Sequence, residues 1–446
     1  MSAAVEDGGV GRGMASVGAS EPLGFGRGFR LSFMMFFQYS IWGAWLPLLY
    51  PFLKEHRGFS ASEIASMFAV GAVGSIFGPF IAGQVADRHF STERFLGVSH
   101  LLGGVLVWQL ATLESYGAFL VFSLVYSMIY SPTLALTNSL SFHHLPDRDR
   151  DFGKVRLWGT VGWIAAGIGI GQWLLRVHTP VDADDAVVRA AQVAGMSDAF
   201  RLSAILGLLQ GLYCFSLPHT PPARGKERSA WMEALGEVRV QPLLTLFLLA
   251  VPVSCIHQFY FVHTATFLGA YQFKLSGWIN EVFGVAGGGL MTLGQVSEIF
   301  VLAAIPLVAK RVSRRSLLAV GLVAYAARMA LFAWVDVIPL PPLVTLVAGI
   351  LMHGLCFGCF IFVAFMIVDE ETTKDVRATA QNLFNLVIVG IGTIAGSYLA
   401  TGLAEVYTPA GEQIPDYSKL FVIPLAASVA CLVLLFVFYP KRSSRA

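Results

Sequence analysis

Charged residues are scarce in this sequence. Asp, Glu, Lys and Arg together make up 13% of the 446 residues, about half of their share in an ordinary soluble domain. Hydrophobic residues make up 56%, and the mean hydropathy is +0.67. The strict alternation of apolar and polar residues that marks the strands of an outer-membrane barrel is missing as well. The composition therefore excludes an ordinary soluble domain and predicts an all-α integral membrane protein.

Signals of catalysis are also missing. The sequence shows no nucleophile–base pair, no cluster of metal ligands and no phosphate-binding loop, and its glycine-rich stretches fall inside apolar segments instead of a strand-to-helix turn. We therefore expect neither an enzyme nor a bound cofactor. The formal net charge of +2 gives no reason to expect a nucleic-acid partner.

The cysteines do not indicate chemistry either. All five lie in apolar runs. Cys356 and Cys359 form an isolated C-x-x-C pair, without a second pair or a nearby polar ligand. Packing between helices is therefore favoured over a metal or redox site.

Long apolar segments dominate the sequence instead. A helix that crosses a membrane needs about 20 mostly apolar residues, and twelve segments of this kind can be found. They lie near residues 30–52, 62–86, 95–112, 117–142, 155–177, 197–217, 241–270, 280–309, 316–335, 340–368, 377–404 and 418–440. The sequence thus predicts twelve transmembrane helices.

The distribution of Lys and Arg predicts the orientation. If the N-terminus is cytoplasmic, most Lys and Arg residues fall in loops and tails on the cytoplasmic side, as the positive-inside rule requires. Both termini are then cytoplasmic. We expect a multi-pass protein of the plasma membrane, which is the inner membrane in a bacterium.

The expected domain organisation follows from the same pattern. Residues 1–29 and 441–446 are predicted to be cytoplasmic tails, the first of them disordered. Residues 218–240 form the longest polar stretch between spans on the cytoplasmic side and divide the spans into two sets of six, at 30–217 and 241–440. Two six-helix halves joined by a cytoplasmic linker resemble the major facilitator superfamily, whose cargo site lies at the midplane between the halves.

One short motif strengthens this resemblance. After the second span the sequence reads Gly83-Gln-Val-Ala-Asp87-Arg88, which is similar to the superfamily's signature GxLaDrxGr in the same loop. Phe90 stands where a glycine is usual, so the match is partial. The corresponding loop of the second half, Lys310 to Arg315, keeps only the basic residues. A solvated charge cluster is the alternative interpretation.

Polar residues within the spans are candidates for a binding site. An ionisable side chain at the centre of a membrane helix costs about 2.5–3.5 kcal/mol, so a chain that keeps several is expected to use them on a polar cargo or on protons. Helical spacing places the candidates in four groups, each on one face of a span. The groups are Arg156, Thr160 and Trp163; Gln258 and Phe261; Gln295 and Glu298; and His353 and Phe357.

These four groups supply donors, acceptors, a cation, an acid and aromatic rings. Such a set suits a small, flat, polyhydroxylated ligand, with rings against its faces and amides at its edge. Hydrogen bonding between helices is the alternative for each residue taken alone. For Arg156 a second alternative is that its charge extends to the membrane surface.

Other polar residues are interpreted as structural. His100 and Asn138 are expected to satisfy neighbouring groups, and Arg328 needs a carboxylate or carbonyl partner that the sequence does not identify. The acidic run from Asp369 to Glu371 is expected either to pair with Arg377 as an inner gate or to form a plain surface cluster.

Several short stretches match one known family in their order and spacing. They are Trp42-Gly43-Ala-Trp45, Val85-Ala86-Asp87, Pro132 to Asn138, Arg156-Leu-Trp-Gly-Thr160, Leu217 to Pro221, Thr266-Phe-Leu268, Gln295-Val-Ser-Glu298, Arg328 to Ala333 and Arg377 to Gln381. Through these stretches, from about Ser32 to Tyr439, the chain resembles the bacterial nucleoside:proton symporters of the major facilitator superfamily.

The resemblance implies a nucleoside pocket. The residues that match the family's pocket are Arg156, Thr160, Gln258, Gln295, Glu298 and Phe357. Three further pocket positions differ, since Trp163 stands where the family has phenylalanine, Phe261 replaces an asparagine and His353 replaces a tyrosine. Gly358 occupies a position where the family has an aspartate, which is a candidate for ligand binding and proton coupling.

Proton coupling must then depend on another group. Glu298 is predicted to be the proton carrier, because a carboxyl group within the membrane can load and unload a proton. His353 is the second candidate, because an imidazole titrates near neutral pH unaided.

The predicted function is therefore nucleoside import by alternating access, driven by proton symport, in a monomer surrounded by lipid. A symporter or facilitator for sugars or other polyols on the same scaffold is the alternative. The changes at Phe261, His353 and Gly358 are the reason to keep that alternative open.

Overall fold

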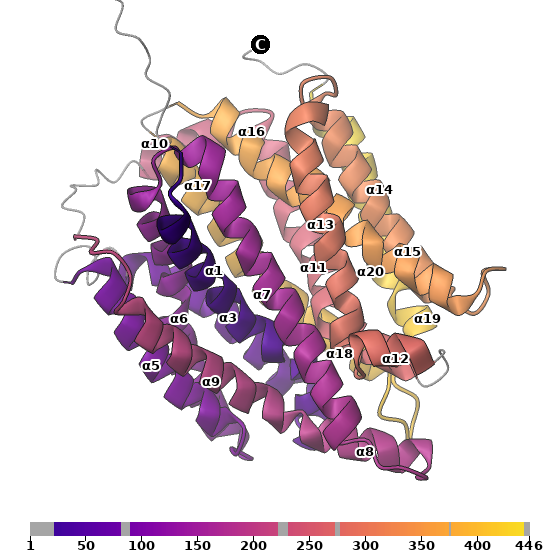
Figure 1. Cartoon of the computed structure of the whole chain (residues 1–446). Helices are drawn as coiled ribbons and strands as arrows, with labels where there is room; N and C mark the ends of the chain where they lie inside the picture. Colours follow the sequence, from indigo (N-terminus) through magenta and orange to yellow (C-terminus); the bar gives the residue numbers. More distant parts are fainter. Residues whose placement is uncertain (1–21, 82–89, 222–230, 273–276, 374–375, 441–446) are drawn as a thin grey trace, which may run out of the picture.

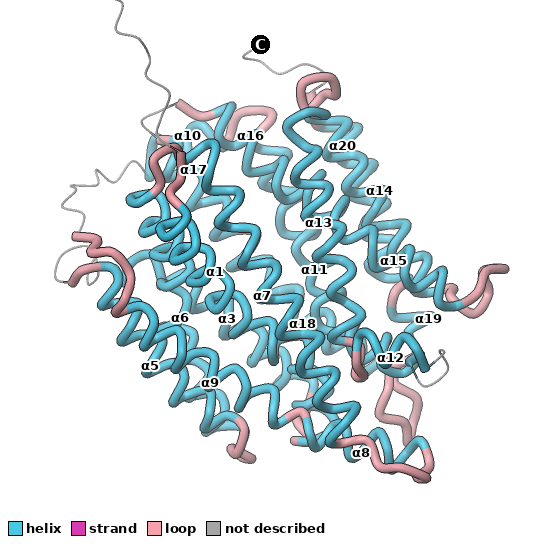
Figure 2. Tube along the Cα trace, in the orientation of Figure 1, coloured by secondary structure: helices cyan, strands magenta, loops and turns pink. Residues whose placement is uncertain are grey.

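The computed structural model describes residues 22–81, 90–221, 231–272, 277–373 and 376–440. Within this part of the chain every regular element is a helix and none is a strand (Figures 1 and 2). The all-helical prediction is therefore confirmed for these residues. The motif from Gly83 to Arg88 lies outside them, as do most of the predicted tails and part of the predicted linker.

Helices from the first part of the chain form what we call the N-terminal group. Its long helices are α1 (Phe25–Trp45), α3 (Ala61–Ile81), α5 (Thr92–Leu110), α6 (Tyr116–His144), α7 (Arg148–Val177) and α9 (Ser197–Cys214). Its short elements are a 3-10 turn (Leu46–Leu48), α2 (Leu49–Pro51), a π-helical turn (Phe52–His56) and α8 (Asp185–Gly195). Helix α1 packs against α7 and α9, α3 against α6, and α5 against α6 and α9.

The remaining helices form the C-terminal group. Its main helices are α11 (Leu243–Gln272), α13 (Gly288–Val308), α14 (Arg314–Ala333), α15 (Pro342–Cys356), α16 (Val363–Glu371), α17 (Arg377–Asn385), α18 (Gly392–Val406) and α20 (Val422–Phe438), with short helices α10 (Trp231–Val238), α12 (Gly277–Phe283) and α19 (Tyr417–Leu420). π-helical stretches join α15 to α16 (Phe357–Phe362) and α17 to α18 (Leu386–Ile391). Helix α11 packs against α18 and α20, and α15 packs against α13 and α14.

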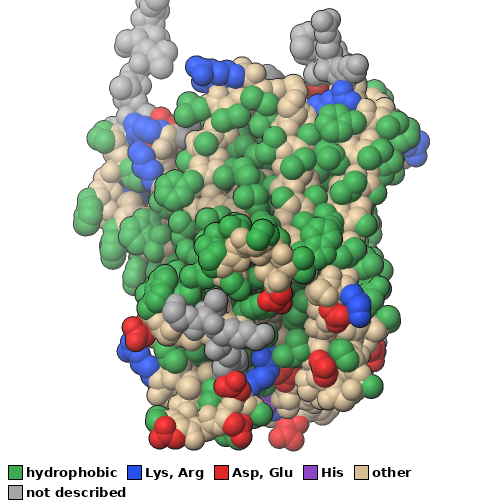
Figure 3. All heavy atoms as spheres, turned by 90° about the vertical axis from the view of Figure 1, so that its right-hand side faces the viewer, with side chains coloured by type: hydrophobic (Ala, Val, Ile, Leu, Met, Phe, Trp, Pro, Cys, Tyr) green, Lys and Arg blue, Asp and Glu red, His purple; other side chains and the backbone are tan. Residues whose placement is uncertain are grey.

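Eight helical segments in the described part of the chain are long and apolar enough to cross a membrane. They are Ala61–Gly78, Tyr116–His144, Leu243–Gln272, Gly288–Val308, Arg314–Ala333, Pro342–Glu371, Thr379–Val406 and Tyr417–Phe438. The four other predicted spans are helical too and correspond to α1, α5, α7 and α9. Figure 3 shows a broad apolar band around one side of the molecule, with acidic side chains concentrated below it. These features are those of a multi-pass membrane protein.

Glycines let α1 and α7 approach until their backbones touch. A Cβ atom on Gly162 would lie 2.1 Å from the carbonyl oxygen of Phe36, and one on Gly43 would lie 2.8 Å from the backbone of Trp163. Any larger residue at either position would push the two helices apart. Close helix packing, the role expected for the glycines of the fifth span, is thus confirmed at Gly162.

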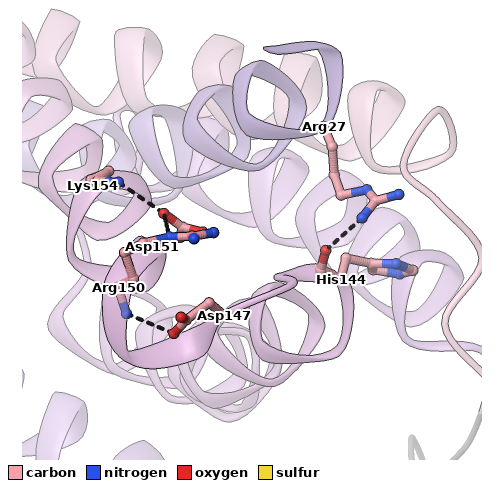
Figure 4. Close-up of polar contacts among 6 residues, drawn as sticks. All are labelled: Arg27, His144, Asp147, Arg150, Asp151 and Lys154. Atoms are coloured by element: carbon pink, nitrogen blue, oxygen red, sulfur yellow. Dashed lines mark hydrogen bonds and ion pairs between the residues drawn. The ribbon is translucent and has the colours of Figure 1, made fainter. Parts of the chain in front are cut away.

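A charge cluster holds the first turns of α7 (Figure 4). Asp147 caps the helix, because its carboxylate accepts a hydrogen bond from the backbone N–H of Arg150 at 3.0 Å. Asp151 accepts from the guanidinium of Arg150 at 3.0 and 2.6 Å and from the ammonium of Lys154 at 2.8 Å. These hydrogen bonds lower the pKa of Asp151, which precedes the predicted span, to about 2. Helix α7 carries the first of the four predicted groups of binding residues.

The two helix groups meet through α7 with α13 and through α3 with α18. In Figure 1, α7 and α13 draw together toward the end of the molecule where α8 and α12 lie, which we call the α8/α12 end. There the backbone N–H of Val285 donates to the carbonyl of Gly171 at 3.1 Å, and the Gln172 amide donates to the carbonyl of Glu281 at 2.7 Å. Gly284 has a φ of +73°, and a Cβ atom there would lie 2.1 Å from the Gly171 carbonyl carbon. The groups therefore touch backbone to backbone at this end.

Candidate functional site

A cavity of about 200 Å³ lies between the two helix groups. The N-terminal group contributes α1 with the turn after it, α3 and α6, and the C-terminal group contributes α11 and the junction of α17 and α18. The lining residues are Trp42, Trp45, Leu46, Leu49, Met67, Phe68, Val70, Gly71, Ala72, Ser75, Phe119, Ser123, Tyr126, Ser127, Gln258, Phe261, Val389 and Thr393. Because both groups form its walls, any motion of one group against the other changes this cavity.

Aromatic rings dominate the wall from the N-terminal group. Trp42 packs against Tyr130 with ring centroids 4.9 Å apart, and Tyr126 stacks on the same Tyr130 at 5.3 Å. Trp45 continues the series by stacking on Phe200 at 5.3 Å. Packed rings of this kind present rigid flat faces, which suit a flat ligand.

Polar groups are few and face the cavity from specific places. Gln258 is buried, and its amide N–H donates to the Ser397 hydroxyl at 3.1 Å, which leaves its carbonyl oxygen available. The indole N–H of Trp45 and the hydroxyl of Tyr126 are buried close to one another, but neither reaches hydrogen-bonding geometry. Buried donors without partners are costly, and both atoms are shielded from the cavity in this arrangement.

The predicted site residues fall into four places in the structure. Gln258 and Phe261 line the cavity. Gln295, Glu298 and His353 come together between α13 and α15 in the C-terminal group. The Nε2 atom of His353 lies 3.5 Å from Oε2 of Glu298 and 3.4 Å from the amide nitrogen of Gln295.

The α7 residues are held against α1. The guanidinium of Arg156 lies over the ring of Tyr39, with its Cζ atom 3.9 Å from the ring centroid, and the backbone of Trp163 touches Gly43. Thr160 lies between them on α7 and is half-buried. Arg156 therefore makes a cation–π contact within the N-terminal group.

Phe357 and Gly358 begin the π-helical stretch after α15. Phe357 is half-buried, whereas Gly358 is buried against α13. A Cβ atom on Gly358 would lie 2.6 Å from a methyl group of Val301. The space that a side chain would need at this position is therefore filled by Val301.

Phe261 connects the cavity to the cluster around His353. Its ring lines the cavity, and it also lies edge-on to His257 at 5.0 Å and to His353 at 6.3 Å. The two histidine rings stack on one another at 5.6 Å. A ligand in the cavity would therefore be one aromatic ring away from His353.

Arg328 has an unexpected partner. It is fully buried, and its guanidinium donates to Nδ1 of His353 at 3.2 Å. Its Cζ atom lies 4.1 Å from the ring centroid of Tyr260 and 5.1 Å from that of Tyr325. The expected carboxylate or carbonyl partner is thus replaced by an imidazole and two aromatic rings.

Two other expectations are met by hydrogen bonds or ion pairs. His100 bonds to Gln38 at 2.9 Å, which confirms that it satisfies a neighbour. Asp369 pairs with Arg377 at 3.5 Å, and the adjacent Glu370 pairs with Arg314 of α14 at 2.6 Å. The pairing of the acidic run with Arg377 is confirmed, while its use as a gate stays a prediction.

The aromatic residues of the N-terminal wall were not among the site residues that the sequence predicted. Their signal is nevertheless visible, because Trp42, Trp45 and Leu49 share one helical face at spacings of three and four, and Phe119 and Tyr126 share another. Such stripes are common in helices that pack against each other, so the sequence does not show that these face a cavity.

Comparisons with known proteins agree with these observations. The profile of the family described as nucleoside H⁺ symporter matches residues 25–444. The putative nucleoside transporter YegT of Escherichia coli (strain K12) is 32% identical over 426 residues, covering 93% of this chain and 94% of that protein. The nucleoside permease NupG of the same strain is 26% identical over 418 residues, covering 92% and 94%. The crystal structure of the nucleoside transporter NupG has the same fold, with a TM-score of 0.79 at 24% identity, covering 93% of this chain and 99% of that chain.

Proposed function

Because this chain belongs to the nucleoside H⁺ symporter family, we propose that it imports nucleosides together with protons through the cavity between its two helix groups. The cavity is the observation that carries this proposal. It combines flat aromatic walls with a few polar groups, as a nucleoside requires, and its walls come from both groups. The backbone contacts at the α8/α12 end close one side of the molecule.

The proposed architecture is that of twelve transmembrane helices in two six-helix halves, the N-terminal and C-terminal groups. The termini are proposed to be cytoplasmic, with the α8/α12 end outside, in the inner membrane of a bacterium. The excess of Lys and Arg in the predicted cytoplasmic loops supports this orientation. Alternating access would then open the two ends in turn, the α8/α12 end to the outside and the opposite end to the cytoplasm. A single chain in lipid is proposed to be sufficient.

Each site residue has a proposed role. Gln258 is proposed to hydrogen-bond the nucleoside, and Phe261 to contact its flat face together with Trp42 and Trp45. The other proposed substrate contacts, which would form as the groups move, are Arg156, Thr160, Trp163, Gln295, Glu298, His353 and Phe357.

Glu298 is the proposed proton carrier. Its side chain is 16% exposed, while that of His353 is 2% exposed. A proton can therefore reach Glu298 more easily than it can reach His353.

The deciding experiment is uptake of labelled uridine and adenosine in cells that lack their own nucleoside carriers. We expect accumulation of at least one of them, and loss of accumulation when a protonophore is added. Gln258→Ala should reduce uptake, whereas Gln109→Ala, an exposed position on α5, should not. Uptake that survives the protonophore would contradict proton coupling. Absence of nucleoside uptake together with uptake of a hexose would contradict the substrate assignment.

A further inference from the structure

The surroundings of Arg328 pose a problem of charge balance. Arg328 is fully buried in the C-terminal group, and among the described residues no carboxylate lies within ion-pair distance of it. An arginine keeps its positive charge under all ordinary conditions, and an isolated buried charge is strongly unfavourable. The two aromatic rings beside the guanidinium offset part of this cost. The remainder must be met through its hydrogen-bond partner, His353.

The hydrogen bond from Arg328 determines the state of His353. A guanidinium only donates hydrogen bonds, so the Nδ1 atom of His353, 3.2 Å away, must present a lone pair. The neutral imidazole then carries its proton on Nε2. Oε2 of Glu298 lies 3.5 Å from that nitrogen. A network of polar contacts, which we call the Arg328 chain of contacts, therefore connects the guanidinium of Arg328 through the imidazole of His353 to the carboxyl group of Glu298.

Gln295 fits this chain in only one orientation. The structure places the amide nitrogen of Gln295 3.4 Å from Nε2 of His353, and this orientation would set two N–H groups against each other. Since Nε2 donates, the amide oxygen of Gln295 must face it, and the amide nitrogen then faces away. Amide orientation is inferred from such networks, and here the network is decided by Arg328.

A second proton on His353 is disfavoured from every side. It would break the hydrogen bond to Arg328 and place two cations side by side. The titratable and charged groups around the imidazole are Glu298 from α13, His257 and Tyr260 from α11, Tyr325 and Arg328 from α14, and Cys356 from α15. Within this set Glu298 is the one carboxyl group. His353 therefore links Arg328 and Glu298 as a neutral imidazole.

We infer that Arg328 and His353 are positioning residues that balance ionised Glu298 and tie its protonation to the packing of α11, α13, α14 and α15. With Glu298 ionised, the cation of Arg328 has a counter-charge at the far end of the imidazole. Protonation of Glu298 removes that counter-charge while Arg328 stays fully buried. The arrangement of the four helices then becomes less favourable, which promotes the change of conformation. This inference rests on the proposed function and specifies how its proton site is coupled.

The Arg328 chain of contacts also touches the cavity. Phe261 lines the cavity and touches both His257 and His353. A substrate that packs on Phe261 can therefore shift the imidazole between Arg328 and Glu298. Substrate binding at Phe261 and proton binding at Glu298 thus both affect the position of the His353 imidazole.

The first test follows Glu298 itself, without any substrate. The infrared band of a protonated carboxyl group, assigned by its loss in Glu298→Gln, is titrated in the purified wild-type protein and in variants. Loss of a nearby cation disfavours the carboxylate, so Arg328→Met should move the midpoint upward by about one pH unit. Arg328→Lys keeps the charge and should restore most of the wild-type midpoint. His353→Gln, which can face Glu298 without reaching Arg328, should move the midpoint in the same direction as Arg328→Met.

Tyr325→Phe is the matched control. It keeps the ring beside Arg328 and removes only the hydroxyl that bonds to His257 at 2.8 Å. Its midpoint should remain within about 0.2 pH units of wild type, since the charge on Arg328 is unchanged. An equal shift in Tyr325→Phe and Arg328→Met, or an unchanged midpoint in a folded Arg328→Met protein, would overturn the inference. If Arg328→Met does not fold, an unchanged midpoint in His353→Gln overturns it instead.

The second test measures transport in proteoliposomes. Arg328→Met should lose at least about tenfold in nucleoside accumulation driven by a pH gradient while keeping exchange of labelled for unlabelled nucleoside, and Arg328→Lys, which keeps the charge, should retain most of the accumulation. Equal losses of accumulation and exchange in Arg328→Met would show that Arg328 serves only folding or substrate binding. A wild-type protein that carries no nucleoside would refute the proposed function. The infrared titration would still show whether Arg328 and His353 control the protonation of Glu298.

Discussion

Each helix group has a buried histidine in a side-chain network, and these two histidines, His100 and His353, have opposite surroundings. In the N-terminal group, His100 bonds to the Gln38 carbonyl oxygen at 2.9 Å, and the Gln38 amide donates to Thr133 at 2.9 Å. All these partners are neutral. In the C-terminal group, His353 lies between a permanent cation, Arg328, and an acid, Glu298.

The difference separates a structural network from one that can respond to protons. A neutral network is satisfied in one arrangement and has no charge to gain or lose. A network with a cation at one end and a carboxylate at the other changes its balance when a single proton arrives. Burial of a histidine within a membrane helix is therefore no sign of proton transport by itself, because its partners decide.

The largest effect is expected from removal of the acid in the C-terminal network. Glu298→Gln cannot ionise, so nucleoside accumulation driven by protons should be lost while exchange continues. A membrane potential adds about 2.3 kcal/mol per proton and 100 mV, or about fiftyfold in accumulation ratio, and this factor should disappear. Uptake and exchange of labelled uridine in proteoliposomes measure both. Glu412→Gln, at an exposed position, is the control, and full accumulation by Glu298→Gln would reject Glu298 as the carrier.

A change in the N-terminal network should lower the stability of the protein and leave the coupling of transport to protons unchanged. Gln38→Leu leaves the buried His100 and Thr133 without their partner, which costs about 1–3 kcal/mol. We expect a clear drop in the melting temperature of the purified protein. The pH midpoint of transport by the remaining folded protein should stay unchanged. A shifted midpoint would show that the N-terminal network also takes part in proton coupling.

A smaller effect is expected where the C-terminal group meets the cavity. Gln258→Ala removes one hydrogen bond to the substrate, worth about 1 kcal/mol, so the KM for nucleoside should rise about fivefold with little change in kcat. Initial rates of uptake over a range of nucleoside concentrations measure this split. A fall in kcat with an unchanged KM would place Gln258 in the conformational step instead.

The smallest effect concerns an acid of the N-terminal group that is held in its ionised form. Burial alone would raise the pKa of Glu93, at the start of α5, but the nearby Ser91 hydroxyl and hydrogen bonds from the Thr220 backbone N–H and His219 lower it below its usual value. Glu93 therefore stabilises the fold above its unfolded pKa of about 4.3, and this contribution is lost as the pH falls through the lower folded value.

The Glu93→Gln variant should accordingly melt at a lower temperature than wild type at pH 7, by a small amount. The difference should shrink as the pH is lowered below about 4. Melting curves of the two purified proteins over this range measure it. A constant difference at all pH values would show that shape, and not charge, makes Glu93 stabilising.

Local pattern predicted much of the fold. Apolar segments of membrane length became helices, because a chain in lipid must satisfy its backbone hydrogen bonds within each segment. Helical spacing correctly placed Gln258 with Phe261 and Gln295 with Glu298 on α11 and α13. The boundaries were less exact: α1 begins at Phe25, within the predicted tail, and α10 occupies part of the predicted linker.

The candidate site was only partly predictable. The sequence singled out His353 and Arg328 but not their contact, since they lie on different helices and meet only after packing. No sequence pattern predicted the π-helical stretches at Phe357–Phe362 and Leu386–Ile391. Each of them changes which residues share a helical face. The roles of the site residues stay predictions until the variants above are measured.

By itself the sequence determined the class of protein, the helical segments and the polar residues they carry, because these depend on transfer to lipid and on the period of one helix. Only the tertiary structure decided which helix faces meet. It built the cavity from five places in the chain, filled the space beside Gly358 with Val301, and set Arg328 against His353. Such contacts depend on how whole helices pack, and no local pattern contains that information.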